Sequence, residues 1–525
     1  MTADALSSVP LSDMDEAERY AQFDRLQQRM PRVWERMRLN EEGESVVVVP
    51  SVTLDKVTER SGSMSQAMEE RFLFLLLLLR EPRLRMVYVT SMPIAPTIVE
   101  YYLALLPGII PSHARARLSL VSVNDSSPRA LSEKLLQRPR LLRRIGDLVP
   151  DRTRSHLVPY NTTALERDLA IALGIPMYGA DPRLFELGTK TGCRRLFADE
   201  GVRHPIGFED LHTMDDVLDA TLRLRAERPT AQAVIVKLNE GVSGEGNALV
   251  DLRGLPSPGA AEERSAVGDR LRAMSFEGPD VPFDGYVTKF ADRGGIVEEL
   301  ISGTELRSPS VQMRVLPGSR KVELLSGHDQ LLGGPSGQSY LGCRFPADFA
   351  YAKAIGSEAM IVGERLAREG VLGRFAIDFV VVKDAAGAWT PYAIEINLRK
   401  GGTTHPFLTL QFLTDGRYDA ATGLFLTPAG REKHLVATDH FESPTLRALS
   451  IDDLFDIVAR HALHFDQSRQ TGVVFHMISC LTEHGRVGLT AVGDSPAQAE
   501  AIYQRAQRVL LDEADAAIRD ISIST

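Results

Sequence analysis

The first third of the chain alternates short apolar runs with longer segments of helical character. The apolar runs are typical of strands and occur at Val46–Val49, Met86–Val89, Leu118–Val123 and His156–Pro159. The helical segments between them include Ser65–Leu79 and Ala130–Ile145. Strands that alternate with helices favour a parallel, open α/β sheet. We therefore predict an α/β domain over residues 1–180.

The pattern changes after residue 180. Residues 311–315 alternate at period two, as in a half-buried strand, and polar stretches rich in Gly and Pro interrupt the neighbouring segments. A mixed α+β domain is predicted over residues 181–430. Further on, Val473–Ser479 and Val487–Thr490 resemble paired strands. A small α+β domain is predicted over residues 431–525, in which the sequence shows no chemical motif.

Composition excludes several classes of protein. The net charge of -10 argues against a nucleic-acid carrier. The wholly apolar run Phe72–Leu79 is much shorter than the roughly 20 residues of a spanning helix, so it predicts a buried helix and no membrane partner. The isolated cysteines Cys193, Cys343 and Cys480 fit a reducing cytoplasm better than a disulfide framework.

Acidic residues embedded in two apolar segments carry the strongest chemical signal. Glu395 and Asn397 are two residues apart, so in a strand they project from one face. If the segment containing Asp378 pairs with that strand, its carboxylate joins the same face. Two carboxylates and an amide oxygen form a hard oxygen site suited to Mg²⁺. The alternative interpretation is an ordinary hairpin with an exposed acidic face.

A second signal is a glycine-rich loop that follows a strand carrying Lys237. The loop contains Gly241, Ser243, Gly244 and Gly246. Glycines let the backbone approach phosphate oxygens, and successive amide groups can form an anion site. The spacing is neither that of a Walker A loop nor a Gly-x-Gly-x-x-Gly fingerprint after a strand. A plain hairpin remains the alternative.

A third segment is an apolar strand that ends in carboxylates, Glu298 and Glu299, followed by Ile301 and Glu305. The edge of such a strand could offer backbone hydrogen bonds to a base, and Glu305 could hold ribose hydroxyls. A strand that simply ends in a turn is the alternative interpretation.

The order of these pieces, from Lys190 through Lys237 and the glycine loop to Glu395 and Asn397, resembles the ATP-grasp superfamily over about residues 188–405. The resemblance implies an ATP-grasp fold and two Mg²⁺ ions, with Mn²⁺ as a substitute. It implies contacts to ATP phosphates from Lys190, Lys237 and the loop residues Gly241, Ser243, Gly244 and Gly246, an adenine pocket at Glu298, Glu299 and Ile301, a ribose contact from Glu305, and metal ligands at Asp378, Glu395 and Asn397.

The whole chain is more closely similar to the pheganomycin-type peptide ligases, through the stretches 327–330, 337–346 and 397–406. That resemblance implies a Rossmann-like pre-ATP-grasp domain at the N-terminus and a short extra domain at the C-terminus. D-alanine ligases place an arginine two residues before the metal aspartate, where this chain has Ala376. Arg374 or Arg399 is therefore the candidate to stabilise the reacting acyl group, with a structural salt bridge as the alternative for each.

The function that this resemblance implies is ligation of a small-molecule carboxylate to the amine of an amino acid or peptide. ATP would activate the acid as an acyl phosphate, with Lys237 as a catalytic residue and release of ADP and phosphate. Specialised-metabolite biosynthesis in the cytoplasm is the expected setting, and a homo-oligomer is allowed. Two alternatives stay open: an ATP-binding regulatory or scaffold protein without turnover, and phosphoryl transfer to an acceptor other than a carboxylate.

Overall fold

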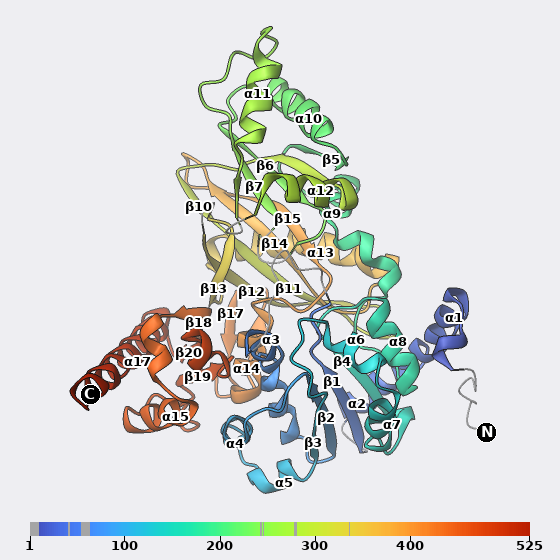
Figure 1. Cartoon of the computed structure of the whole chain (residues 1–525), viewed down its shortest axis with the longest axis vertical. Helices are drawn as coiled ribbons and strands as arrows, with labels where there is room; N and C mark the ends of the chain where they lie inside the picture. Colours follow the sequence, from blue (N-terminus) through green and yellow to red (C-terminus); the bar gives the residue numbers. More distant parts are fainter. Residues whose placement is uncertain are drawn as a thin grey trace.

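The computed structural model describes residues 10–39, 43–53, 63–241, 244, 246–277, 281–334 and 337–524, without the side chains of 38–39 and 520–524. Within these residues the strands form a four-stranded, a five-stranded and a nine-stranded sheet and one short hairpin. In Figure 1 the four-stranded sheet lies below the nine-stranded one, and the five-stranded sheet forms part of the upper lobe.

The N-terminal sheet is parallel, in the order β3-β2-β1-β4, as the alternation of strands and helices predicts. Its strands are β1 (Glu44–Val49), β2 (Leu84–Thr90), β3 (Leu118–Ser122) and β4 (Ser155–Pro159). The segments around it are η1 (Leu11–Asp13), α1 (Glu16–Gln27), α2 (Met30–Leu39), α3 (Ser63–Glu70), η2 (Leu73–Arg80), α4 (Pro96–Ala104), α5 (Pro111–Arg115), α6 (Leu131–Leu136), α7 (Pro139–Asp147), η3 (Arg152–Arg154) and α8 (Ala164–Leu173).

Both faces of this sheet are buried, which is why its central strand is apolar at every position from Val46 to Val49. Val46 and Val48 pack into a core that also contains η2, α4 and residues of the C-terminal strands. Val47 and Val49 face the opposite core, which contains residues of α1, α6 and α8. Side chains alternate across a strand, so each face can be covered by a different set of helices.

The apolar run Phe72–Leu79 is buried, as predicted, but it forms the 3-10 segment η2 and not an α-helix. The helix predicted over Ser65–Leu79 therefore ends at Glu70, and Arg71 lies at the break. Across the described ranges, no helix combines the length and apolar character that a membrane crossing requires.

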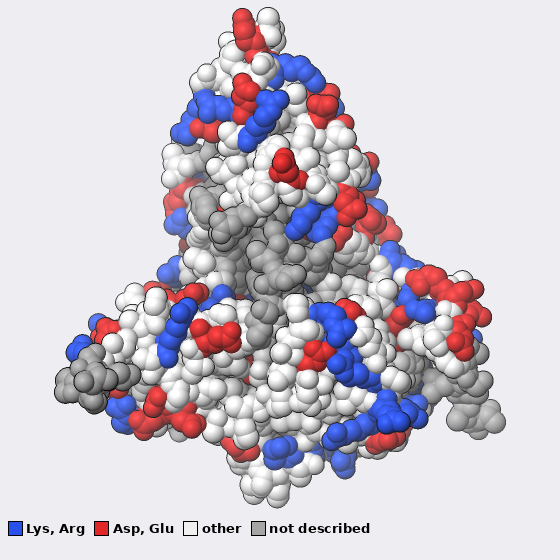
Figure 2. Space-filling model, viewed as in Figure 1, with Lys and Arg blue, Asp and Glu red and all other residues white. Residues whose placement is uncertain are grey.

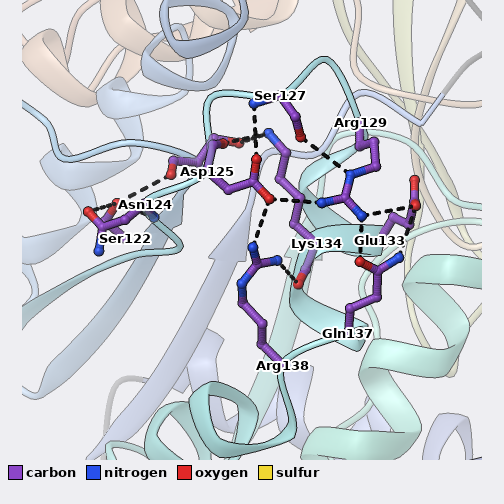
Figure 3. Close-up of polar contacts among 10 residues, drawn as sticks. Ser122, Asn124, Asp125, Ser127, Arg129, Glu133, Lys134, Gln137 and Arg138 are labelled. Atoms are coloured by element: carbon purple, nitrogen blue, oxygen red, sulfur yellow. Dashed lines mark hydrogen bonds and ion pairs between the residues drawn. The ribbon is translucent and has the colours of Figure 1, made fainter.

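The loop after β3 is held by a group of ion pairs around Asp125 (Figure 3). The Asp125 carboxylate accepts hydrogen bonds from Arg129, at 3.0 Å, and from Arg138, at 2.8 Å. Lys134 donates to the Asp125 carbonyl at 2.8 Å. Hydrogen bonds from Ser127 and the guanidinium of Arg138 hold the pKa of Asp125 well below its usual range. The acidic side chain at this edge of the sheet is therefore engaged by the protein's own cations.

The five-stranded sheet is antiparallel, in the order β5-β9-β6-β7-β8. Its strands are β5 (Gly207–Leu211), β6 (Ala233–Leu238), β7 (Asn247–Asp251), β8 (Ser275–Phe276) and β9 (Gly295–Glu299). Helices α10 (Met214–Glu227), α11 (Glu263–Arg272) and α12 (Phe283–Arg293) share its core, while η4 (Pro182–Gly188) and α9 (Lys190–Asp199) precede it in the chain.

The nine-stranded sheet runs in the order β10-β14-β11-β12-β13-β18-β20-β19, and β15 pairs with the other side of β14. Its strands are β10 (Glu305–Arg307), β11 (Pro309–Val315), β12 (Val322–Gly333), β13 (Ser339–Phe345), β14 (Gly373–Lys383), β15 (Trp389–Asn397), β18 (His434–Glu442), β19 (Gly472–His476) and β20 (Arg486–Gly493). The remaining elements are α13 (Phe349–Glu369), α14 (Thr404–Thr414), β16 (Arg417–Asp419), β17 (Leu424–Leu426), η5 (Pro444–Ala448), α15 (Ile451–Arg460), α16 (Cys480–His484) and α17 (Pro496–Ser524).

The strands of residues 431–525 do not form a sheet of their own. Strands β19 and β20 pair with each other, as predicted, but β18 pairs with both β20 and β13. The boundary predicted near residue 430 is therefore not a boundary of the sheet. Gly342 lies at this junction, where an added Cβ would come within 2.1 Å of the Ala437 carbonyl oxygen.

Replacing Gly342 with alanine should force β13 and β18 apart and lower the free energy of unfolding by about 1–3 kcal/mol, the usual cost of overpacking. Urea unfolding followed by circular dichroism measures it. Gly268→Ala is the matched control, because that glycine lies in α11 with only the Arg272 side chain at 4.0 Å. Equal stability of the two variants would show that the β13–β18 junction tolerates separation.

Candidate active site

A cavity of about 540 Å³ lies between the five-stranded and nine-stranded sheets and reaches residues of the N-terminal and C-terminal regions. Most of the residues predicted for the site line it: Lys190, Lys237, Gly241, Gly244, Gly246, Glu298, Glu299, Ile301, Asp378, Glu395, Asn397 and Arg399. Segments separated by more than two hundred positions in the sequence therefore share one space. Their individual roles remain predictions.

The acidic residues meet on two paired strands. Asp378 in β14 lies opposite Glu395 in β15, and Asn397 donates from Nδ2 to Asp378 Oδ2 at 3.0 Å. Opposite residues of an antiparallel pair project from the same face. The pairing on which the sequence prediction depended is thus present, and the exposed acidic hairpin is not: these carboxylates face the cavity.

Lys190 brings a positive charge to this group. It is the first residue of α9, whose N-cap Thr189 accepts from Gly192 N, and its own backbone N donates to Asn239 O at 3.1 Å. Its Nζ lies 2.5 Å from Glu395 Oε1. Burial would raise the pKa of Glu395, but Lys190 lowers it below its ordinary value. The lysine therefore keeps one of the two neighbouring carboxylates ionised.

Among the described residues, no lysine forms an ion pair with Asp378. Burial, followed by the charge of Glu395, raises the pKa of Asp378 to about 6. Neighbouring buried carboxylates are costly unless a cation offsets their charge. Two carboxylates and an amide oxygen on one face form a donor set that Mg²⁺ prefers. The residues present thus fit a divalent cation.

Lys237 lies on β6 and faces Glu298 on the neighbouring strand β9, with which it forms a buried ion pair. Arg194 approaches the second oxygen of Glu298 at 3.4 Å. The Glu299 carboxylate accepts from Ile206 N at 3.1 Å. Ile301 follows on the cavity wall.

The glycine loop lies beside Lys237. Gly244 has a φ of +83°, and a Cβ there would lie 3.1 Å from the Gln338 carbonyl oxygen. The segment before β13 therefore packs against this loop, and Asn247 Nδ2 also donates to Gln338 Oε1 at 2.6 Å. Only glycine combines that φ with that close approach. Ser243 lies outside the described residues.

Two predicted residues lie elsewhere. Arg374 shares a strand face with Asp378 but lies four residues earlier, roughly 13 Å along the strand, and its side chain is buried near Arg314 and Tyr178, where burial lowers its pKa to about 10. Glu305 is not among the lining residues and pairs instead with Lys383 at 3.1 Å. The ribose contact of Glu305 and the catalytic role of Arg374 stay predictions, and neither residue is among those that line this cavity.

Sequence reasoning missed several lining residues: Arg71, Tyr160, Asp439, His440 and Arg486. They come from the N-terminal region and from residues 431–525, where the sequence shows no motif. Tyr340, by contrast, lies within the stretch 337–346 that carries the closer family resemblance. No local pattern signalled the others, because their chemistry arises only where distant segments meet.

Comparison with known proteins agrees with this geometry. Residues 183–275 and 282–421 match the family described as IQCH-like ATP-grasp. This region is an ATP-grasp domain. Residues 453–506 match the family described as PGM1 C-terminal domain.

Among curated proteins, the chain is similar to the L-propargylglycine–L-glutamate ligase of Streptantibioticus cattleyicolor, with 28% identity over 84% of this chain and 89% of that protein. It is also similar to zebrafish (Danio rerio) IQ motif-containing protein H, with 26% identity over 58% of this chain. That match spans 33% of the zebrafish protein.

Solved structures share the fold of the ATP-grasp domain and its flanking regions. The ADP complex of PurK, an N5-carboxyaminoimidazole ribonucleotide synthetase, superposes with a TM-score of 0.51 and 9% identity over 90% of this chain and 98% of that one. Biotin carboxylase from Campylobacter jejuni superposes with a TM-score of 0.51 and 12% identity over 90% and 95%. The relationship to ATP-grasp ligases predicted from the sequence is confirmed.

Lys237→Met should weaken ADP binding about 10- to 100-fold, because a hydrogen bond to a charged group is worth roughly 1.5–3 kcal/mol. Isothermal titration calorimetry with ADP and Mg²⁺ measures the affinity. Lys353→Met is the control, since Lys353 is exposed on α13, away from the cavity. Unchanged ADP affinity in Lys237→Met would remove this lysine from the phosphate site.

Proposed function

We propose that this protein is an ATP-dependent carboxylate–amine ligase that forms an amide through an acyl phosphate, with release of ADP and phosphate. The observation that carries the proposal is the part-buried group of Lys190, Glu395, Asp378 and Asn397 beside a glycine loop in one cavity. The similarity to an L-propargylglycine–L-glutamate ligase supports the same reaction class.

In the first step, an oxygen of the substrate carboxylate attacks the γ-phosphorus of ATP, and the bond to the bridging β–γ oxygen breaks. Lys237, Lys190 and the amide groups of Gly241, Gly244 and Gly246 line the cavity and would hold the phosphate oxygens. Asp378, Glu395 and Asn397 would hold Mg²⁺, as two ions with Mn²⁺ as a substitute. When bound there, the metal would offset the charge of the transferring phosphoryl group.

In the second step, the amine attacks the acyl carbon, loses a proton and displaces phosphate. Arg399 lines the cavity two residues after Asn397, and its Nη1 donates to Tyr160 Oη at 3.3 Å. No ion pair joins Arg399 to an acidic side chain of the described residues, so its charge remains available to a developing oxyanion. We assign this role to Arg399 alone, because Arg374 lies outside the cavity.

We further propose that the acid and the amine are small amino-acid-like molecules, the amine being an amino acid or a peptide, and that the product belongs to specialised metabolism. The relative's name joins two amino acids, which supports this class. Cys193, Cys343 and Cys480 are all buried and free, which fits a reducing cytoplasm.

The acyl phosphate can be trapped by incubating the protein with ATP, Mg²⁺ and hydroxylamine. The acids to be tried are the twenty proteinogenic amino acids and their N-acyl derivatives. At least one acid should yield a hydroxamate and ADP. Hydroxylamine traps an acyl phosphate, whereas binding without turnover or transfer to a hydroxyl acceptor gives no hydroxamate. Release of AMP and pyrophosphate would contradict the acyl-phosphate route. Mass spectrometry of the hydroxamate and of the released nucleotide distinguishes these outcomes.

Asp378→Asn should reduce hydroxamate formation by at least about 100-fold, since a group that holds a catalytic metal contributes several kcal/mol to the rate. Asp384→Asn is the control, because Asp384 lies in the exposed β14–β15 turn. An Asp378→Asn rate close to that of the wild-type protein at saturating Mg²⁺ would remove Asp378 from the metal site.

A further inference from the structure

One wall of the cavity is formed by a cluster to which the proposed phosphate and metal sites assign no role. Arg71 follows α3, His405 is in α14, Asp439 in β18 and His476 in β19. Both Arg71 and Asp439 line the cavity, and all four side chains are at least nine-tenths buried. Residues from the two ends of the chain are thus joined at one wall of the site.

Asp439 is the centre of this cluster. Its Oδ2 pairs with Arg71 Nη2, and its Oδ1 lies 2.8 Å from His476 Nε2 and 3.2 Å from His405 Nε2. Burial would raise the pKa of Asp439, but Arg71 and His405 lower it well below its ordinary value. The carboxylate therefore stays ionised and is surrounded by three possible donors.

The two histidines and Asp439 are residue types that also ligate metals, and their ligand atoms lie within 4.8 Å of one another. The hydrogen bonds favour a different state. Arg71 Nε donates to His405 Nδ1 at 3.3 Å, so the proton of the neutral His405 ring sits on Nε2. That proton occupies the lone pair that a metal would need, and His405 Nε2 lies 3.1 Å from His476 Nε2 and 3.2 Å from Asp439 Oδ1. The cluster is therefore a hydrogen-bonded support for Arg71.

Contacts with His405 and Asp439 hold one edge of the Arg71 guanidinium, and the Nη1 side of the group has no partner among the described residues. Nε and Nη2 of Arg71 are engaged by His405 and Asp439, whereas Nη1 makes no hydrogen bond to any described residue. A guanidinium held in one orientation before binding loses little entropy on meeting a planar anion. Arg71 thus resembles a preformed receptor for a carboxylate.

The charge of the surrounding wall agrees with an anionic ligand. Arg71, Arg399 and Arg486 are its basic residues, and Asp439 is the acidic residue among them. Tyr160 lies between two of the arginines: its hydroxyl accepts from Arg399, and it is close enough to Arg71 to affect the pKa of that guanidinium, with burial and Asp439 as the larger effects. A ligand at Arg71 is therefore adjacent to the residues that follow Asn397.

We propose that Arg71 binds a carboxylate of the amine substrate, so that the enzyme selects an amine that carries a carboxylate, as an amino acid or a peptide does. This inference rests on the proposed ligase function. It also gives residues 431–525 a role in the site, because Asp439 and His476 hold Arg71 in place.

Arg71→Met tests the proposal through two half-reactions of the full-length protein. Hydroxamate formation needs no amine substrate and should stay within about two-fold of the wild-type rate. Amide formation with L-amino acids as acceptors should show a KM for the acceptor raised about 10- to 100-fold, the loss expected for a charged hydrogen bond. Primary amides of the amino acids lack the carboxylate. As acceptors for the wild-type protein, they should show a KM raised as much as that of the amino acids with Arg71→Met.

Arg71→Lys keeps a cation beside Asp439 and guards against a variant that fails to fold. It should melt within a few degrees of the wild-type protein and still show a raised acceptor KM. Arg344→Met is the matched control, because Arg344 is half exposed on β13 and pairs with Glu500; its acceptor KM should be unchanged.

Two results would overturn the inference. One is an equal loss of hydroxamate and amide formation in both Arg71 variants, which would place Arg71 with the acid or the nucleotide. The other is equal use of amino acids and their primary amides by the wild-type protein. If the wild-type protein forms no hydroxamate with any acid, the ligase function itself fails, and this role of Arg71 fails with it.

Discussion

The site depends on the burial of two carboxylates side by side on paired strands. Asp378 and Glu395 face one cavity from β14 and β15, and the fold supplies Lys190 in direct contact with Glu395. Burying like charges is unfavourable unless cations approach. The start of α9 must therefore dock against β15, and Asn239 holds it there through the backbone N of Lys190 and of Thr191. The start of α9 therefore links the residue that follows β6 of the five-stranded sheet with β15 of the nine-stranded sheet.

A second consequence concerns the two ends of the chain. The strands after residue 431 continue the sheet that carries the acidic residues, and the N-terminal sheet packs its Val46 and Val48 face into the same core. Arg71 and Asp439 can therefore meet at the cavity wall although they belong to opposite ends of the sequence. On the face that Figure 2 shows, basic and acidic side chains are interspersed. At the cavity wall, by contrast, charged side chains form specific pairs such as Arg71 with Asp439.

Much of this was predictable from the sequence, because it depends on local pattern. The four strands of the N-terminal sheet follow from apolar runs. The two-residue spacing of Glu395 and Asn397 predicts a shared strand face, which Asp378 joins because its strand pairs with theirs. The role predicted for Arg374 stays a prediction, and the side chain is not among those that line the cavity: a shared strand face does not guarantee a shared cavity when the residues lie four positions apart. The helix predicted over Ser65–Leu79 ends early, because η2 takes over from Leu73. Arg71, Asp439 and His476 had no signal, since each is unremarkable until the tertiary fold brings them together.

The central claim is that Asp378, Glu395 and Asn397 hold a divalent cation against a nucleotide. Electron paramagnetic resonance of Mn²⁺ titrated into the protein with ADP tests it most directly, by separating free from bound metal. The account predicts a bound Mn²⁺ signal that requires ADP in the wild-type protein and is lost in Glu395→Gln. Bound Mn²⁺ of equal affinity in Glu395→Gln, or no ADP-dependent binding in the wild-type protein, would contradict it.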